Sequence, residues 1–280
     1  MKTALLLIYS SCLICFFSCN KQPIPDYNER SSYFKNIASS YQSDSTITCV
    51  TFNIHLGFKG YKDPWDETVL GAGQDQVEAI AKILQNIDPD IIALQEVPRN
   101  RYNAEIGLFL EALASRLNMN YAFGANGYND PYNIYPVYGE WGNAILTKYK
   151  IESIHNQEVE YVNKWERRSM IDVLLSVNDS TQVHALSLHH LPSPEGIPNT
   201  STYIERLQEP VILMGDFNRV NQIIKLDNIG LIDVDSTYRM HRIDRIFITN
   251  NKLKILNIGT IPDTTRTSDH PANYAVLKLQ

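Results

Sequence analysis

Apolar segments that stop abruptly at polar residues are the feature that most constrains how this chain can fold. The run Val211-Ile212-Leu213-Met214 ends in Gly215-Asp216-Phe217-Asn218, and Thr267-Ser268-Asp269-His270 precedes Pro271 and a final apolar segment. A short apolar run bounded by turn residues indicates a buried strand whose polar residues lie at the edge of a sheet. We therefore expect carboxylates, amides and histidines to meet at strand ends, as metal-assisted phosphate chemistry requires.

Residues 1–19 have the pattern of an export signal rather than of a folded element. Lys2 gives a positive start, and the apolar stretch at 4–17 is shorter than the about 20 residues of a membrane-spanning helix. Phe16-Phe17-Ser18-Cys19 resembles a loose bacterial lipobox, although Phe17 stands where a small residue is usual. A lipobox cysteine is lipidated, so we expect an exported lipoprotein anchored to a membrane through Cys19, periplasmic or at the cell surface. Ordinary secretion is the alternative.

The sequence after the leader predicts a tether followed by one domain. Residues 20–46 are polar and contain prolines and several serines, so we expect a flexible tether. Residues 47–280 are long enough for a single α/β domain, which we expect to be a monomer. The other cysteines lie in the leader or at its end, so Cys49 has no partner for a disulfide within the domain.

The charge balance argues against a protein dedicated to binding long nucleic acids. The chain has a net charge of −6 and contains no run rich in lysine or arginine. Proteins that bind DNA usually present a basic stripe to its phosphates, and no such patch is evident here. A bound metal ion would supply local positive charge, so a nuclease remains an alternative.

Hydrophobic periodicity predicts strands interleaved with a few helices. Helical spacing marks residues 74–86 and 104–117, and shorter helices are expected around 201–208 and 220–227. Strands are expected at residues 47–54, 90–96, 121–124, 142–147, 151–160, 169–177, 182–190, 211–215, 243–249, 253–260 and 272–279. This pattern indicates one layered, mixed α/β domain.

Eight short motifs follow one another along the chain, each at or beside an expected strand. They read Thr-Phe-Asn-Ile-His, Leu-Gln-Glu-Val, Gly-Asn-Ala-Ile-Leu, Glu-Arg-Arg, Leu-His-His-Leu, Gly-Asp-Phe-Asn, Ile-Asp-Arg-Ile-Phe and Ser-Asp-His-Pro. Their order resembles the endonuclease/exonuclease/phosphatase superfamily, which includes DNase-like nucleases, neutral sphingomyelinases and inositol-polyphosphate phosphatases. The resemblance covers about residues 47–280. It implies a four-layer α/β/β/α sandwich of two mixed β-sheets flanked by helices, with the active site at one rim.

The resemblance also implies a metal site and phosphate contacts. Glu96 would be the main ligand of Mg²⁺ or Mn²⁺, hard cations that prefer oxygen donors. Asn53 would support this ion, and Asp269 would assist at it. Asn143 and Arg167 would contact the phosphate of the substrate. Arg168 is the alternative to Arg167, because both belong to the Glu-Arg-Arg motif.

The remaining motif residues would carry the reaction. Asp216 would orient or deprotonate the attacking water, and Asn218 would hold that water or a phosphoryl oxygen. His270, paired with the carboxylate of Asp244, would act on the nucleophile or bind phosphate. His190 would donate to the oxygens of the phosphorane, because alignment to the family's Thr-His-Leu motif selects it. A metal, a positioned base and hydrogen-bond donors are what attack on a phosphate needs.

Several assignments stay open at this point. The neighbouring His189 competes with His190, and His55 would either touch the metal or substrate or lie at the rim. Arg206 and Gln208 would be the remnant of a family helix that is shortened here. Aromatic residues of two Gly- and Pro-rich segments would form a substrate platform or pack on the core: Tyr61, Trp65, Tyr128, Tyr132, Tyr135, Tyr138 and Trp141.

These features together predict an exported, metal-dependent hydrolase of phosphate esters. The expected substrate is a phosphodiester or phosphomonoester that is small or derived from a lipid. A secreted nuclease is the alternative within this chemistry. A binding lipoprotein that keeps the fold without catalysis is the alternative outside it, and the intact set of acidic, amide and histidine residues argues against it.

Overall fold

The computed structural model describes the domain in segments. These are residues 32–38, 45–64, 66, 68–101, 103–126, 139–163, 166–192, 196–218, 224–235 and 243–280. The expected leader, Cys19 and most of the expected tether lie outside the described residues. Within them, no helix is both long and apolar enough to cross a membrane.

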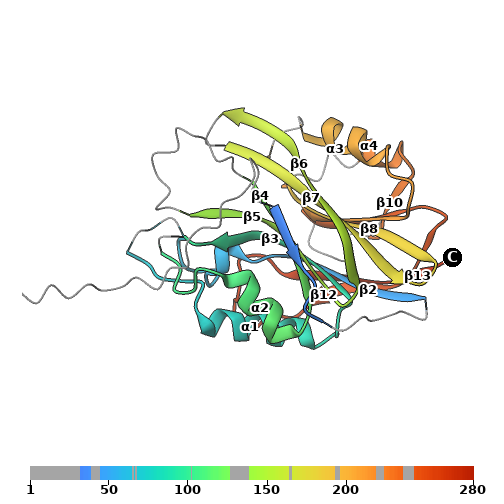
Figure 1. Ribbon diagram of the computed structural model, residues 1–280. Coiled ribbons are helices and arrows are strands. Elements are labelled where there is room, and N and C mark those ends of the chain that lie inside the picture. The colour runs from blue at the N-terminus through green and yellow to red at the C-terminus, as the bar shows by residue number, and fades with distance from the viewer. Residues whose placement is uncertain are drawn as a thin grey trace, which may run out of the picture.

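Two mixed β-sheets pack face to face, and helices cover their outer faces (Figure 1). The 7-stranded sheet has the order β1 (Ser32–Lys35), β4 (Asn120–Ala125), β5 (Glu140–Thr147), β3 (Ile91–Arg99), β2 (Thr46–Asn53), β13 (Ala272–Leu279) and β12 (Leu253–Ile261). The 6-stranded sheet has the order β10 (Leu231–Asp233), β11 (Asp244–Thr249), β9 (Val211–Asp216), β8 (Thr181–His189), β7 (Glu166–Asn178) and β6 (Lys150–Asn163). The described helices are η1 (His55–Gly57), α1 (Gln74–Gln85), α2 (Phe109–Leu117), α3 (Gly196–Ile204) and α4 (Ile224–Asp227).

Three apolar clusters hold these layers together. The first joins α1 and α2 to the 7-stranded sheet, the second lies between the two sheets, and the third joins α3 and α4 to the 6-stranded sheet. In β2, Ile47 and Cys49 face the other sheet, whereas Val50 and Phe52 face the helices. β2 is therefore packed on both faces, although threonines interrupt its apolar residues. The expected four-layer sandwich is confirmed.

The parallel pairs β2–β3 and β8–β9 bring the polar strand ends together. Asn53 pairs with Gln95 in the first ladder, and His189 pairs with Asp216 in the second. Because parallel strands end at the same edge, each pair delivers two polar residues to one rim. The two sheets pack on each other, so both pairs meet at this rim.

The structure corrects three sequence-based boundaries. Ser32–Lys35 falls inside the expected tether, yet it forms β1 and pairs with β4. Tyr33 holds it there by donating to Glu111 (2.8 Å) and by lying under the Arg99 guanidinium, which is 4.5 Å from the ring centroid. These contacts are far apart in sequence, so a four-residue strand leaves no local pattern. The short β10 was also missed, and α2 begins at Phe109 instead of residue 104.

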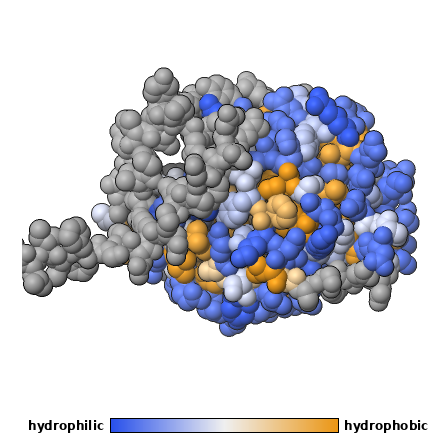
Figure 2. Space-filling view, in the orientation of Figure 1, coloured by the Kyte–Doolittle hydropathy of each residue, from blue (hydrophilic) through white to orange (hydrophobic). Residues whose placement is uncertain are grey.

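The visible surface is mostly polar. Figure 2 shows apolar side chains gathered near the middle of the face on which β1 lies in Figure 1. Within the described residues 32–38, Phe34 and Ile37 are large apolar residues that are 40% and 39% exposed. Small apolar groups of this kind are common on protein surfaces.

Candidate active site

The candidate site begins with a bulge in β3. The register of β3 against β5 shifts between Leu94 and Val97, and Glu96 in this gap adopts a positive φ of 54°. A β-bulge re-aims the side chain of the extra residue. The Glu96 carboxylate is therefore turned to the rim, while the neighbouring Gln95 stays fully buried between the sheets.

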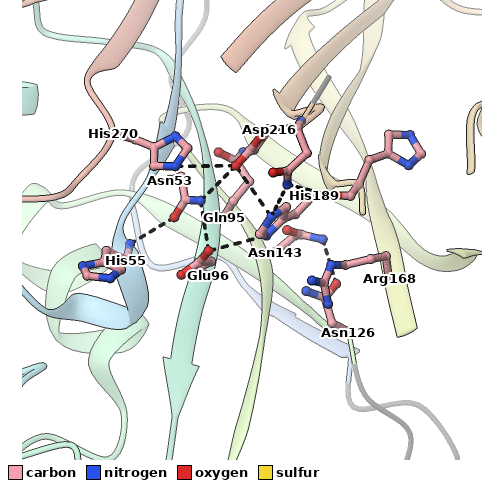
Figure 3. Close-up of polar contacts among 12 residues, drawn as sticks. Asn53, His55, Gln95, Glu96, Asn126, Asn143, Arg168, His189, Asp216 and His270 are labelled. Atoms are coloured by element: carbon pink, nitrogen blue, oxygen red, sulfur yellow. Dashed lines mark hydrogen bonds and ion pairs between the residues drawn. The ribbon is translucent and has the colours of Figure 1, made fainter. Parts of the chain in front are cut away.

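Asn53 connects two carboxylates from different sheets (Figure 3). Its Nδ2 donates to Glu96 Oε1 and to Asp216 Oδ2, both at 3.1 Å. Its Oδ1 accepts the backbone N–H of His55 at 3.0 Å, which fixes the orientation of the amide. The expected partners Asn53, Glu96 and Asp216 thus converge on one point.

Asp216 and Asn218 form a tight turn after β9. The backbone N–H of Asn218 donates to Asp216 Oδ1 (2.8 Å). The Asn218 amide nitrogen donates to the carbonyl of His190 (2.8 Å) and lies 2.9 Å from Nε2 of His189. Gly215 lets this strand approach β8 closely, since a Cβ there would lie 2.2 Å from the Leu188 carbonyl.

His270 is held by a buried carboxylate. Its Nδ1 lies 2.9 Å from Asp244 Oδ2, and its Nε2 lies 3.8 Å from Asp216 Oδ2. Burial lowers the pKa of His270, but the hydrogen bond and charge of Asp244 outweigh it and raise the pKa to about 9. Burial, with the charge of Asp244, raises the pKa of Asp216 to about 7. The site therefore pairs an imidazolium with a carboxyl group that titrates near neutral pH.

The donor set fits a hard divalent cation. Burial raises the pKa of Glu96, as it does that of Asp216, so a positive charge beside them would favour the ionised form of both carboxylates. Asp269 is largely exposed, and its Oδ2 lies 3.8 Å from Nε2 of His55. Asp216, Asp244 and His270 also offer ligand atoms within 4.8 Å of one another, but Asp244 already binds Nδ1 of His270. Oxygen ligands around Glu96 suit Mg²⁺ or Mn²⁺ better.

In the structure His189, and not His190, occupies the position that the sequence predicts for the catalytic histidine. The His189 ring lies beside Asn218, with Nε2 at 3.6 Å from Asp216 Oδ2 and Nδ1 at 3.9 Å from Glu96 Oε1. Burial, followed by the positive charge of Arg168, lowers the pKa of His189 well below its usual value, so the ring is neutral. Adjacent side chains of a strand point to opposite faces, so only one of the two histidines can face the rim.

His190 is turned inward instead. Its ring is fully buried, with Nδ1 3.2 Å from Glu160 Oε2 and Nε2 3.2 Å from Thr200 Oγ1. Glu160 also accepts the N–H groups of Leu191 (2.6 Å) and Gly196 (3.0 Å). The expected catalytic role of His190 is therefore replaced by a structural contact that holds the end of β8 to α3.

The same alternation separates the two arginines. Arg167 turns to Glu158, with 3.5 Å between Nη1 and Oε2. Arg168 lies on the site side, and its guanidinium carbon is 4.8 Å from the ring centroid of Trp141. The geometry thus favours Arg168, the alternative, over Arg167 as the phosphate contact.

Asn143 forms hydrogen bonds with residues that the sequence analysis did not identify. Its Nδ2 donates to the Ser169 carbonyl (2.7 Å) and to Asn126 Oδ1 (3.1 Å). Asn143 Oδ1, Asn126 Nδ2 and His189 Nδ1 are buried, and no hydrogen-bond partner for them lies among the described residues. Asn126 directly follows β4, so a polar residue at a strand end was the signal that could have found it.

Other expected residues are less central. Trp141 packs edge-on against His189 at 6.0 Å between ring centroids, whereas Tyr61 is 63% exposed. Trp65, Tyr128, Tyr132, Tyr135 and Tyr138 lie outside the described residues. Arg206 and Gln208 follow the end of α3 and do not enter the contacts described at the site.

Comparisons with known proteins identify the family of this chain. The model of the Endonuclease/Exonuclease/phosphatase family matches residues 50–270. The chain belongs to this family. Its members hydrolyse phosphate esters and generally use divalent metals.

Individual relatives are distant in sequence and similar in fold. The uncharacterized protein YbhP of Escherichia coli K12 is 24% identical over 259 residues, covering 82% of this chain and 95% of that protein. The catalytic domain of human Nocturnin, solved with a bound sulfate anion, has a TM-score of 0.63 and 17% identity, covering 89% of this chain and 97% of that one. A family member from Bacteroides thetaiotaomicron has a TM-score of 0.62 and 16% identity, covering 84% and 96%. At these identities the two solved structures show the fold alone.

Proposed function

We propose that this family member is an exported, divalent-metal-dependent hydrolase of phosphate esters, anchored to a membrane through Cys19. The observation that carries the proposal is the convergence of Glu96 and Asp216 on the Asn53 amide, next to His270. Mg²⁺ or Mn²⁺ held by Glu96, with Asn53 and Asp269 assisting, would offset the charge that develops on the phosphate.

Side chains of the protein would position the water, accept its proton and bind the phosphoryl oxygens. Asp216 orients the attacking water and accepts its proton, a task for which a pKa of about 7 is suited. Asn218 holds the water or a phosphoryl oxygen through its amide. His270, kept protonated by Asp244, donates to a phosphoryl oxygen.

The opposite wall binds the phosphate and the rest of the substrate. Neutral His189 and the Asn143 amide face the rim, and Arg168 adds a positive charge beside them. Trp141 gives this wall an apolar surface. Together with the net charge of −6, one arginine beside one aromatic ring supports a small or lipid-derived phosphate ester over a long nucleic acid.

Hydrolysis by the purified full chain tests this proposal. The substrates are bis-p-nitrophenyl phosphate, p-nitrophenyl phosphate, sphingomyelin and plasmid DNA, each with Mg²⁺, Mn²⁺ or EDTA. We expect activity on at least one of the first three, loss in EDTA, and a fall of about 10²–10⁴-fold in Asp216→Asn. Asp227→Asn on the exposed face of α4 is the matched control and keeps full activity.

The outcomes separate the alternatives. Preference for plasmid DNA would establish the nuclease. Absence of hydrolysis of every substrate, with a folded protein that still binds Mg²⁺ or Mn²⁺ in a titration, would favour the binding lipoprotein. Equal activity of Asp216→Asn and the parent would contradict the assigned site.

A further inference from the structure

The first strand of the domain starts at the rim that carries the candidate site. In the β1–β4 ladder, Ser32 pairs with Gly124 and Lys35 pairs with Tyr121. Asn126, two residues beyond Gly124, accepts from Asn143 at the site. The chain therefore enters the domain beside the site, and β1 then runs away from it.

The other end of the chain lies at the far edge. β13 begins two residues after His270 and runs from the rim to Gln280, whose N–H donates to the Lys252 carbonyl (3.0 Å). Eight strand residues span about 27 Å at about 3.4 Å per residue. An attachment upstream of Ser32 and one at Gln280 would thus hold opposite edges of the sandwich.

Thirteen steps of chain separate Cys19 from Ser32, which fully extended reach at most about 45 Å. As a flexible coil the same length has a typical end-to-end distance of about 20 Å. A membrane that holds Cys19 is therefore within about 45 Å of the edge where β1 starts, at a typical distance of about 20 Å, and the site shares that edge.

A loop of this rim exposes large apolar side chains. We name residues 58–73 the rim loop, of which 65 and 67 lie outside the described residues. Gly60 donates to the Arg266 carbonyl (3.0 Å), and a Cβ there would lie 2.4 Å from Ser268, so the loop packs directly on the Ser268–His270 segment. Next to it, Tyr61 is 63% and Leu70 is 56% exposed.

The rim loop is also fixed in place. Lys62 Nζ donates to the Leu70 carbonyl (3.1 Å), and the Pro64 carbonyl accepts from Arg101 and Asn103 at 3.2 and 2.9 Å. Two exposed apolar residues are too few to bind a bilayer by themselves, but an acyl chain already supplies affinity. The loop's lysines, Lys59 and Lys62, are outnumbered by Asp63, Asp66 and Glu67, so contact would not depend on anionic lipid.

We propose that the tether and the rim loop face the candidate site toward the membrane that holds the anchor, with Tyr61 and Leu70 touching the lipid surface. This inference rests on the anchor in the proposed function and narrows the substrate to a phosphate ester of a membrane lipid. The apolar side chains over β1 are the competing surface (Figure 2), because the domain could instead lie on Phe34 and Ile37.

Fluorescence quenching tests the orientation without relying on catalysis. The lipidated chain begins at Cys19 and so lacks Cys12 and Cys15, and Cys49 is buried, so a thiol-reactive dye labels only an introduced cysteine. The variants are Leu70→Cys on the rim loop, Lys252→Cys at the far edge and Phe34→Cys on β1. In phosphatidylcholine vesicles with a quencher at headgroup level, we expect quenching at position 70 to exceed that at 252 several-fold.

Other quenching patterns overturn the inference. Equal quenching at 70 and 252 would mean no preferred orientation, and the strongest quenching at 34 would mean that the domain lies on β1. A chain whose mass shows no lipid on Cys19 and that stays off the vesicles overturns the anchor and the inference together. Replacing a fifth of the phosphatidylcholine by phosphatidylglycerol should leave the quenching at 70 unchanged.

A rate measurement then tests the substrate class. The anchored parent and Cys19→Ser act on phospholipid in vesicles and on soluble bis-p-nitrophenyl phosphate. We expect about equal rates on the soluble ester and at least a tenfold faster release from vesicles by the anchored chain. No activity on either substrate contradicts the proposed function and leaves the quenching to decide the orientation. Equal vesicle rates contradict the lipid substrate.

Discussion

At the end of β8, His189 and His190 point in opposite directions, and this direction decides what each can do. His189 faces Asn218, Asp216 and the rim, whereas His190 faces Glu160 inside the protein. Both are nearly inaccessible, at 5% and 0% exposure, so burial alone does not distinguish them. Their contacts distinguish them, because only His189 lies beside Asp216 and Asn218.

Exchanging each histidine for glutamine separates the two roles. In His189→Gln we expect kcat to fall about 10²-fold with an unchanged Tm, because the amide N–H does not take the position of the imidazole N–H beside the phosphate, while packing is kept. In His190→Gln we expect the free energy of unfolding to fall by about 1–3 kcal/mol, because Glu160 loses a buried partner. Kinetics and thermal unfolding of both variants check this. A larger loss of kcat in His190→Gln at full stability would restore the role first expected for it.

Asp244 sets the charge of His270. Burial alone would lower the pKa of His270, and Asp244 is the main group that raises it to about 9. Asp244→Asn should therefore move this pKa down by more than one unit, and the fully protonated state should be confined to lower pH. NMR titration of the His270 ring in the metal-free protein measures this directly. An unchanged pKa would show that Asp216 and Asp269, the weaker contributors, suffice.

At the scale of elements, the sequence predicted most of what is local. Apolar runs such as Val211–Met214 and the helical spacing of residues 74–86 identify strands and helices because their signal lies within a few neighbours. β1 escaped because Tyr33 is held by residues nearly 80 positions away. The sequence could not decide between His189 and His190. It shows that neighbouring side chains of a strand alternate between two faces, but which of the two faces meets the rim depends on the packing of the sheet.

A pair formed by a histidine and an aspartate joins β7 and β8 away from the site. His184 of β8 contacts Asp172 of β7 at 2.7 Å, and Tyr203 of α3 donates to the same carboxylate at 2.8 Å. Burial lowers the pKa of His184, but the hydrogen bond and charge of Asp172, with Glu209, outweigh it and raise the pKa. A raised folded-state pKa means that protonation favours the folded state.

The contribution of the His184–Asp172 pair to the free energy of unfolding should depend on pH. It is fully present below the unfolded-state pKa of about 6.5 and is lost as pH rises through the higher pKa of the folded protein. Urea unfolding of the parent and of His184→Gln should differ most near pH 6, with the difference shrinking toward pH 9. A difference that stays constant across this range would show that packing, not charge, is what His184 contributes.

For the whole molecule, the site exists only while the two sheets keep their relative position. Glu96 and Asn53 come from one sheet, whereas His189 and Asp216 come from the other. Beneath them Gln95 Nε2 donates to Ser187 Oγ (3.1 Å), and that hydroxyl donates to the Leu94 carbonyl (2.9 Å). These buried bonds cross between the sheets directly beneath the site, as the bond from Asn143 to the Ser169 carbonyl does beside it.

Removing this connection should affect stability and catalysis through one cause. Ser187→Ala leaves the Gln95 amide buried without this acceptor, so we expect a loss of about 1–3 kcal/mol in unfolding free energy. The double variant Gln95→Leu/Ser187→Ala removes both polar groups and should recover part of the lost free energy of unfolding. Because Gln95 adjoins Glu96 and Ser187 lies two residues before His189, kcat should stay reduced in the double variant although its stability returns. Full recovery of kcat would mean that the remaining contacts between the sheets position the site without the bond between Gln95 and Ser187.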